Sequence, residues 1–296
     1  MKAHTGTYSV KAMCRALSVS RSGYYKWLGT RDDSSPKQRE DAVLKIEIRK
    51  IHKDNREVYG RPRLHLKLQQ NGHQCGKHRL VRLMKEEGIE GLQKKRFRVK
   101  TTDSNHPYAV APNLLRGHPG PSGPDEIWVA DITYVRTEEG WTYLAAVLDM
   151  FSRKIVGWAM SERINCELTM AALKNALRQR RAPAILHSDR GSQYACYEYR
   201  DLLRDFGINA SMSRKGNPYD NATMESFFGT MQTEEVQGQV YPSRRAARAD
   251  VLASIEAFYN TRRIHTSLHG LSPNQFELQH FTEGDTENTM AQVLTT

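Results

Sequence analysis

The sequence lacks any apolar run near the roughly 18 residues that a membrane-spanning helix requires. Residues 1–4 do not begin an apolar segment of the kind found in signal peptides. Cysteine is also scarce, because Cys14, Cys75, Cys166 and Cys196 lie far apart and form no C-x-x-C pair. We therefore expect a cytoplasmic protein that has reduced cysteines and no structural zinc.

Acidic residues are few in the first hundred residues. That stretch holds 25 Lys and Arg against 10 Asp and Glu, a net charge of +15, whereas the rest of the chain sums to −4. A basic front half is typical of a module that binds nucleic acid, although a solvated basic surface is the alternative. The densest cluster comprises Lys94, Lys95, Arg96, Arg98 and Lys100.

Sequence patterns divide the chain into five segments. Residues 1–36 predict a helix-turn-helix-like segment, with two short helices over 8–28, although such a pair can also be two simply packed helices. Residues 37–100 predict a basic helical DNA-binding module, and residues 101–124 a linker rich in proline and glycine. Residues 125–283 predict an α/β catalytic domain, and residues 284–296 a polar tail. Arg21, Arg61 and Arg63 are candidate DNA contacts in the first two segments.

The α/β domain is predicted to begin with antiparallel strands at 127–135, 141–148 and 155–160. A helix at 168–181, a short strand before Asp189, a helix at 197–206, a strand at 208–213 and a helix from about 221 to 235 follow. The order β-β-β-α-β-α-β-α is the pattern of a ribonuclease-H-like domain. We therefore predict a mixed five-stranded sheet with flanking helices.

Three carboxylates stand out in this domain. Asp131 lies inside an apolar strand, where an ionised group costs several kcal/mol unless something positive compensates it. A buried Lys or Arg is one solution, and a divalent cation is the other. Asp189 falls where a strand ends, a position that favours ligand binding in α/β sheets, and Glu225 lies early in a helix.

Three carboxylates on a strand, a strand end and a facing helix can hold two Mg²⁺ ions. Magnesium prefers a few carboxylates together with water and substrate phosphate. Two ions about 3.5–4 Å apart activate the attacking oxygen and stabilise the leaving oxygen in phosphoryl transfer. The pattern therefore favours metal-dependent phosphoryl transfer.

Six motifs stand out along the chain: YGRPR at 59–63, WVADITY at 128–134, HSDRGSQY at 187–194, GNPYDNA at 216–222, ESFF at 225–228 and YNTRRIH at 259–265. They resemble those of bacterial insertion-sequence transposases with a retroviral-integrase-type DDE catalytic core. The resemblance is to the second-frame (OrfB) product of elements that encode two overlapping frames, and it spans nearly the whole chain.

The resemblance implies that Asp131, Asp189 and Glu225 are the catalytic, metal-binding triad. It implies a DNA transposase that uses Mg²⁺, with Mn²⁺ as a substitute, to cut the ends of an insertion sequence. The exposed 3′-OH then attacks target DNA. The implied partners are terminal-repeat DNA, target DNA and further copies of the chain, with fusion to an upstream-frame DNA-binding protein through frameshifting.

One position departs from the resembled family. Seven residues after Glu225 the family often carries Lys or Arg, whereas this chain has Gln232, which removes a charge directed at DNA phosphate. Arg263 and His265 in the last motif are candidate phosphate contacts. Asp149 is predicted to cap the turn that follows it, and Asp220 to cap a helix.

Two other functions fit parts of the pattern. A DNA-binding regulator with a metal-free α/β domain would explain the basic front half but not Asp131. A ribonuclease-H-type nuclease would explain the carboxylates but not a helix-turn-helix pattern suited to defined DNA ends. A strand-joining assay separates a nuclease from a transposase.

Overall fold

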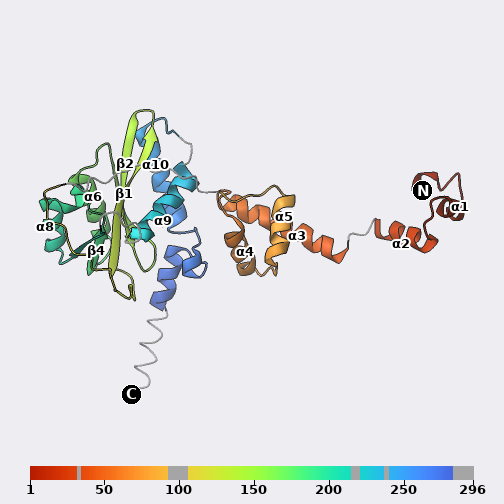
Figure 1. Ribbon diagram of the computed structural model, residues 1–296, viewed down its shortest axis with the longest axis horizontal. Helices are drawn as coiled ribbons and strands as arrows, with labels where there is room; N and C mark the ends of the chain where they lie inside the picture. The colour runs from red at the N-terminus through yellow and green to blue at the C-terminus, as the bar shows by residue number, and fades with distance from the viewer. Residues whose placement is uncertain (32–34, 93–105, 215–220, 237–239, 283–296) are drawn as a thin grey trace, which may run out of the picture. The chain divides into compact units, whose positions relative to one another are not determined.

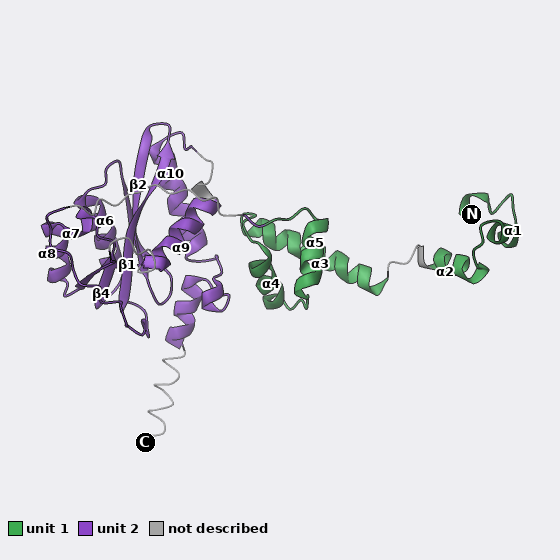
Figure 2. Ribbon diagram, in the orientation of Figure 1, with its two compact units in different colours: residues 1–90 green, residues 91–296 purple. Residues whose placement is uncertain are grey.

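The computed structural model describes residues 1–31, 35–92, 106–214, 221–236 and 240–282. The chain divides into two compact units, unit 1 (residues 1–90) and unit 2 (residues 91–296) (Figure 2). The basic cluster at 94–100, Asp220 and the predicted tail at 284–296 lie outside the described residues. In the ranges that are described, no helix combines the length and the apolar character that a membrane span requires.

Unit 1 begins with a short turn of 3-10 helix, η1 (Lys2–His4), and two helices, α1 (Val10–Ala16) and α2 (Arg21–Arg31). Serines start both helices, because Ser9 Oγ accepts a hydrogen bond from the Ala12 amide and Ser20 Oγ accepts one from the Gly23 amide. These are the two short helices that the sequence predicts at residues 8–28.

Three further helices of unit 1 pack against one another: α3 (Pro36–Asp54), α4 (Arg61–Gln70) and α5 (Lys77–Glu86). A capping box starts α3, since Ser35 Oγ accepts from the Gln38 amide while Gln38 Oε1 accepts from the Ser35 amide. Each helix buries one stripe of aliphatic side chains at helical spacing. The fully buried ones are Ile48, Leu64, Leu68, Leu80 and Leu83.

Unit 2 is built on a five-stranded sheet of strand order β3-β2-β1-β4-β5. The strands β1 (Ile127–Thr137), β2 (Gly140–Asp149) and β3 (Ile155–Ser161) are antiparallel neighbours. The short strands β4 (Ile185–Ser188) and β5 (Asn209–Met212) run parallel to β1. The predicted mixed five-stranded sheet is confirmed.

Helices cover both faces of this sheet (Figure 1). The helices α6 (Cys166–Leu177) and α8 (Tyr197–Asp205) pack on one face, and α9 (Ala222–Met231) and α10 (Arg244–Leu252) pack on the other. Side chains alternate along a strand, so Trp128 and Ala130 of β1 face α6, whereas Val129 and Val135 face α9. Asp131 has the parity of Val129 and therefore lies on the α9 face.

The second half of unit 2 is mostly helical. The helix α9 continues directly into a π-helical segment, η3 (Gln232–Val236), and α10 continues into a second one, η4 (Ala253–Tyr259). A turn of 3-10 helix, η5 (Thr266–Leu268), and a helical stretch over residues 273–282 follow. The sequence patterns did not predict either π-helical segment, because hydrophobic spacing indicates a helix but not a local widening of its turns.

A disulfide corrects one expectation. We expected four reduced cysteines, but Cys166, the first residue of α6, is bonded to Cys196, the residue before α8. The two lie 30 residues apart in the sequence, and the packing of α6 beside α8 brings them together. Cys14 and Cys75 are free and buried.

Candidate active site

The register of the sheet brings two of the predicted carboxylates to the same level. In the parallel pair of β1 and β4, Trp128 lies opposite Leu186 and Val129 lies opposite His187. Two residues further along are Asp131 in β1 and Asp189 just beyond the end of β4. Parallel pairing therefore places Asp189 beside Asp131, although 57 residues separate them in the chain.

A tight turn orients Asp189. Its Oδ1 accepts a hydrogen bond from the Gly191 amide at 2.9 Å, and the chain then enters the short helix α7 (Ser192–Ala195). The carboxylate is therefore held at the end of the strand by backbone of its own loop, as the Gly- and Ser-rich sequence after it suggests.

The third carboxylate, Glu225, comes from the helix on the same face as Asp131. Met224, Phe227 and Phe228 of α9 are buried against that face of the sheet. Glu225 lies in the first turn of α9 and remains exposed. Its negative charge acts on Asp131, as does that of Asp189.

Asp131 carries a strong electrostatic signature. Burial raises the pKa of Asp131 well above its usual range, and the negative charges of Asp189 and Glu225 raise it further. A hydrogen bond from the Ile132 amide (2.7 Å) to Oδ1 opposes this. Within the described residues, no Lys or Arg side chain pairs with Asp131. The sequence left open a buried Lys or Arg as the partner of Asp131. The described residues contain no such partner.

The spacing of the three carboxylates bears on how they could share a cation. Among the described residues, the one group of three potential ligands whose donor atoms all lie within 4.8 Å is Cys166, Cys196 and Glu198, and its two sulfurs are bonded to each other. The three carboxylates do not form such a group in this structure. Two ions about 3.5–4 Å apart require ligands spread over a longer distance.

Tyr194, on α7, is a residue of this region that the sequence did not single out. Its side chain is 2% exposed, and its hydroxyl finds no hydrogen-bond partner in the described structure. Burial raises the pKa of Tyr194 well above its usual range, and the negative charges of Asp131 and Asp189 contribute. An orphaned buried hydroxyl costs about 1–3 kcal/mol. Because the Tyr194 hydroxyl lies near two carboxylates, its lack of a partner fits a site that binds a polar ligand.

His187 anchors the end of β4, two residues before Asp189. It is fully buried between two serine hydroxyls on and just after the neighbouring strand β5, with Nδ1 2.8 Å from Ser211 Oγ and Nε2 2.9 Å from Ser213 Oγ. The Leu114 amide also donates to Ser211 Oγ, at 2.9 Å. The stretch that the sequence suggests as a linker therefore contacts the sheet beside the carboxylates.

The predicted DNA contacts occupy different environments. Arg21 and Arg61 are exposed at the first positions of α2 and α4. The guanidinium of Arg63 lies 5.5 Å from the ring centre of Tyr59. His265 is half-buried with its ring against Tyr259.

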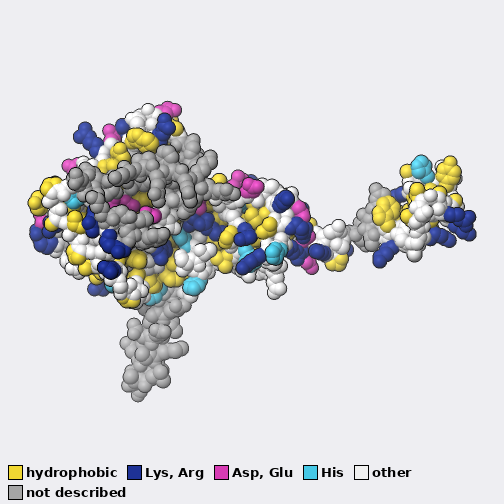
Figure 3. Space-filling model, viewed as in Figure 1, with side chains coloured by type: hydrophobic (Ala, Val, Ile, Leu, Met, Phe, Trp, Pro, Cys, Tyr) yellow, Lys and Arg dark blue, Asp and Glu magenta, His cyan; other side chains and the backbone are white. Residues whose placement is uncertain are grey.

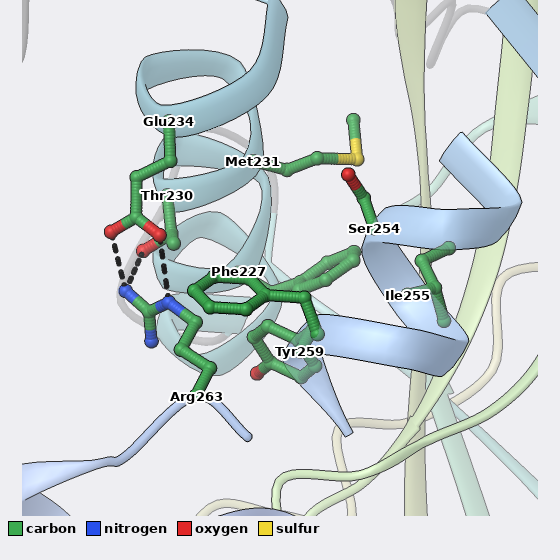
Figure 4. Close-up of a pocket in the computed structure, with 9 residues that line it drawn as sticks. Phe227, Thr230, Met231, Glu234, Ser254, Ile255, Tyr259 and Arg263 are labelled. Carbon is green, nitrogen blue, oxygen red and sulfur yellow. Dashed lines mark hydrogen bonds and ion pairs between the residues drawn. The ribbon is translucent and has the colours of Figure 1, made fainter. Parts of the chain in front are cut away.

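Arg263, a predicted phosphate contact, lies in the interior of unit 2 in this structure. It is 2% exposed and forms a two-pronged ion pair with Glu234, with both N–O distances at 2.8 Å (Figure 4). Nη2 also lies 3.4 Å from Thr230 Oγ1, and the guanidinium is 5.7 Å from the ring centre of Tyr259. These residues line a small pocket beside α9. Arg263 therefore joins the α9–η3 helix to the chain after η4.

Two further expectations concern polar side chains near the site. Gln232, where the resembled family often has a basic residue, donates from Nε2 to Thr133 Oγ1 at 2.8 Å. Its amide is thus bound two residues along β1 from Asp131. Asp149 caps the turn after β2, as predicted, because its Oδ1 accepts from the Ser152 amide at 2.7 Å.

Family models and full-length relatives match this chain. Two models described as "Integrase core domain" match residues 121–218 and 206–273, and one described as "HTH-like domain" matches residues 38–97, which contain α3 to α5. The chain is 47% identical to the insertion element IS600 uncharacterized 31 kDa protein of Shigella sonnei, covering 89% of this chain and 97% of the relative. It is 38% identical to transposase InsF for insertion sequence IS3A of Escherichia coli K12, covering 93% and 96%.

Solved structures also align with the chain at low sequence identity. The simian T-cell lymphotropic virus intasome in complex with PP2A regulatory subunit B56 gamma aligns at a TM-score of 0.46 and 16% identity, covering 77% of this chain and 73% of the other. The HTLV-2 integrase catalytic core domain in complex with magnesium aligns at 0.42 and 16%, covering 53% and 98%.

Proposed function

The chain belongs to the IS3-type insertion-sequence transposases with an integrase core, and we propose that it cuts the ends of its element and transfers the 3′-OH to target DNA. The observation that carries this proposal is Asp131, a buried carboxylate that meets two other negative charges and no basic side chain in the described structure. A structural role alone gives no reason for such an arrangement, which lowers the stability of the folded state.

Mg²⁺ fits the residues present, and we assign Asp131, Asp189 and Glu225 as the groups that would hold it. Carboxylate oxygens are the donors that Mg²⁺ prefers, and we propose that the three side chains hold two ions, with Mn²⁺ as a substitute. Bound Mg²⁺ supplies positive charge that activates the attacking oxygen and stabilises the leaving oxygen of the phosphodiester. The buried hydroxyl of Tyr194 is an additional donor near this set.

The chain's own residues prepare the site before DNA arrives. The Gly191 amide holds the Asp189 carboxylate at the strand end, and the Ile132 amide holds that of Asp131. The buried aromatic face of α9 fixes the helix that presents Glu225. Proton release from Asp131 accompanies any cation that binds its carboxylate, because the raised pKa favours the neutral acid in the absence of positive charge.

The proposed substrates are the terminal repeats of the element and a target duplex in the bacterial cytoplasm. Arg21, Arg61, Arg63, His265 and the basic cluster at 94–100 are proposed to contact phosphate. Arg263 stays a predicted phosphate contact that would first have to leave its ion pair with Glu234. Cutting and joining two ends favours more than one copy of the chain on the DNA, and fusion to an upstream-frame DNA-binding protein would supply further end recognition.

Nicking and joining of labelled terminal-repeat DNA by the wild type and Glu225→Gln test the proposal. The wild type should yield joined product only with Mg²⁺ or Mn²⁺, and Glu225→Gln should yield none while binding DNA as the wild type does. Ser226→Ala, an exposed neighbour on α9, is the matched control and should retain activity. Cutting without joining would indicate a nuclease, and equal activity of Glu225→Gln would exclude Glu225 from the site.

A further inference from the structure

The disulfide between Cys166 and Cys196 encloses part of the candidate active site. The chain between the two cysteines contains β4, Asp189 and α7, so the bond closes a loop around one of the three carboxylates. Cys196 follows Asp189 by seven positions in the sequence. A covalent bond at this place therefore acts on the segment that positions Asp189.

The segment after Asp189 is held by short-range bonds. Its helix α7 has only four residues, and the Tyr194 amide donates to the Gly191 carbonyl within that turn, at 3.0 Å. Toward α6, the Gln193 carbonyl accepts a hydrogen bond from Thr169 Oγ1 at 3.0 Å. A helix this short has little stability of its own. The disulfide to the first residue of α6 is therefore placed to limit local opening of the segment.

The two cysteines of the pair differ in their access to solvent. Cys166 is half-buried at the first position of α6, whereas Cys196 is 6% exposed. The N-terminus of a helix favours the thiolate form of cysteine, which is the nucleophile in thiol–disulfide exchange. In the reduced protein, Cys166 is therefore the thiol that meets a reagent from solution, and Cys196 is the thiol that completes the disulfide.

The surroundings of the pair suit a small anionic disulfide. Arg200, three residues into α8 from its start, is exposed and forms no ion pair within the described residues. Figure 3 shows Lys and Arg side chains on the surface of unit 2, also on the side where α8 lies, and such charges attract anions. The Glu198 carboxylate lies within 4.8 Å of both sulfurs. Its negative charge disfavours two thiolates and so favours the uncharged disulfide.

We propose that Cys166 and Cys196 form a reversible redox switch, closed by a small-molecule disulfide such as glutathione disulfide, that tightens the segment carrying Asp189. The Cys166 thiolate attacks one sulfur of glutathione disulfide, which forms a mixed disulfide and releases one glutathione thiolate. Cys196 then attacks the Cys166 sulfur, which closes the protein disulfide and releases the second glutathione. Two cysteine thiols are thus oxidised, glutathione disulfide is reduced to two glutathione molecules, and the two cysteine protons pass to them.

A switch fits the proposed setting of this protein better than a permanent cross-link. In the cytoplasm, thiols are kept reduced, and the disulfides that do form there are mostly transient and catalytic or redox-sensing. Reduction of the pair removes the covalent closure of the loop and leaves only non-covalent contacts between α7 and α6. The segment after Asp189 then opens more often.

Opening of this segment should weaken cation binding, a consequence that rests on the proposed function. A cation held by Asp131, Asp189 and Glu225 requires all three side chains to be in place at once. Its apparent affinity falls by the fraction of molecules in which they are in place. The oxidised protein should therefore bind Mg²⁺ more tightly than the reduced protein does.

Hydrogen–deuterium exchange of the cation-free protein tests the switch directly. Amides of residues 189–196 should exchange about tenfold faster in the wild type reduced with dithiothreitol than in the wild type oxidised with glutathione disulfide, whereas β2 should not differ. Cys166→Ser/Cys196→Ser should match the reduced protein under both conditions. Cys14→Ala/Cys75→Ala, which changes the two free cysteines, should keep the response. Equal exchange of residues 189–196 in the two redox states would overturn the inference.

Mass spectrometry and a Mg²⁺ titration complete the test. Glutathione disulfide that leaves the folded protein unbonded would overturn the switch, as would a metal ion retained by the reduced thiols and Glu198 at one per chain. The Tm of the oxidised protein should reach half of its Mg²⁺-dependent rise at an about three- to tenfold lower Mg²⁺ concentration. If exchange responds to redox state but neither form responds to Mg²⁺, only the proposed cation site fails. If Mg²⁺ acts identically on both forms and exchange is unchanged, only this inference fails.

Discussion

Asp131 is the residue at which stability and the proposed chemistry oppose each other. Its raised pKa means that the folded state binds a proton more tightly than the unfolded chain does. Its contribution to the free energy of unfolding is therefore greatest below an unfolded value of about 3.9 and declines as pH rises through the folded pKa. At neutral pH, the free energy of unfolding of the cation-free protein is therefore reduced by this contribution.

Replacing Asp131 by Asn should stabilise the protein in EDTA at neutral pH, because Asn is neutral in both the folded and the unfolded state and carries none of this pH-dependent loss. A gain of about 1 kcal/mol corresponds to a rise in Tm of about 2–4 °C for a domain of this size. Addition of Mg²⁺ should raise the Tm of the wild type but not that of Asp131→Asn. Differential scanning fluorimetry measures both. A Mg²⁺ response of equal size in the two proteins would remove Asp131 from the cation site.

Gln232 forms an internal hydrogen bond where the family often has a basic side chain. A basic side chain at this position would be directed at DNA phosphate, whereas the Gln232 amide is hydrogen-bonded to Thr133 inside the unit. The bond ties the start of η3 to β1, two residues from Asp131.

At the scale of secondary-structure elements, the Glu234–Arg263 pair holds the helix that carries Glu225. Its side chains are only 8% and 3% exposed, so neither charge is well solvated. Breaking a buried pair leaves one charge uncompensated, whereas replacing both partners by apolar groups of similar size is often neutral. The pair therefore connects α9–η3 to the chain after η4 at the cost of desolvating two charges.

Glu234→Gln should lower the free energy of unfolding by about 3–5 kcal/mol, because Arg263 would stay buried without its carboxylate. The double variant Glu234→Met/Arg263→Met should recover most of that loss. Urea denaturation followed by tryptophan fluorescence gives both values. A single variant as stable as the wild type would mean that the pair is solvated and contributes little. Lys174→Met, an exposed position on α6, is a control for surface charge.

A second network ties the C-terminal helical residues 273–282 to the sheet. Glu277 accepts from Arg180 at 2.8 and 2.9 Å and from Lys154 at 3.0 Å. Burial acts to raise the pKa of Glu277, but hydrogen bonds and charges from Arg180 and Lys154 outweigh it and lower the pKa. The folded state therefore releases this proton more readily than the unfolded chain does.

The ion-pair network predicts that protonation of Glu277 accounts for part of the stability that the protein loses in acid. The stability from Glu277 is present above its unfolded pKa of about 4.3 and is lost as pH falls from there through the folded value. In Glu277→Gln this component should be absent, so its unfolding free energy should fall less than that of the wild type between about pH 5 and pH 3. Thermal unfolding across that range measures the difference. Parallel curves for both proteins would show that Glu277 contributes no linkage.

At the scale of the whole molecule, charge and catalysis lie in different units. Unit 1 holds 20 Lys and Arg against 10 Asp and Glu, which gives it +10 of the chain's net charge of +11, and all three proposed catalytic carboxylates are in unit 2. A fragment of residues 101–296 should therefore keep the Mg²⁺-dependent rise in Tm while losing at least tenfold in DNA affinity at low salt. Anisotropy and scanning fluorimetry on the fragment test the division. Affinity equal to that of the full chain would place the main DNA contacts in unit 2.

Much of the fold could be predicted because its elements have strong local patterns. The run of β-branched and aromatic residues around Asp131 predicts a central strand, and helical spacing predicts α6 and α8. The four-residue helix α7 and the two π-helical segments were missed, since so few residues carry no periodicity. The three carboxylates could be proposed from the sequence because each interrupts or ends a pattern that is otherwise apolar or turn-like.

The sequence by itself determined the order of strands and helices, the separation of basic from acidic regions and the motifs that identify the family, because these depend on residues close together in the chain. Only the tertiary structure decided that Arg263 is buried against Glu234, that Cys166 meets Cys196 and that Asp131 has no basic partner among the described residues. Such pairings depend on which distant side chains share a low-dielectric interior. Long-range packing sets that environment, and no local pattern records it.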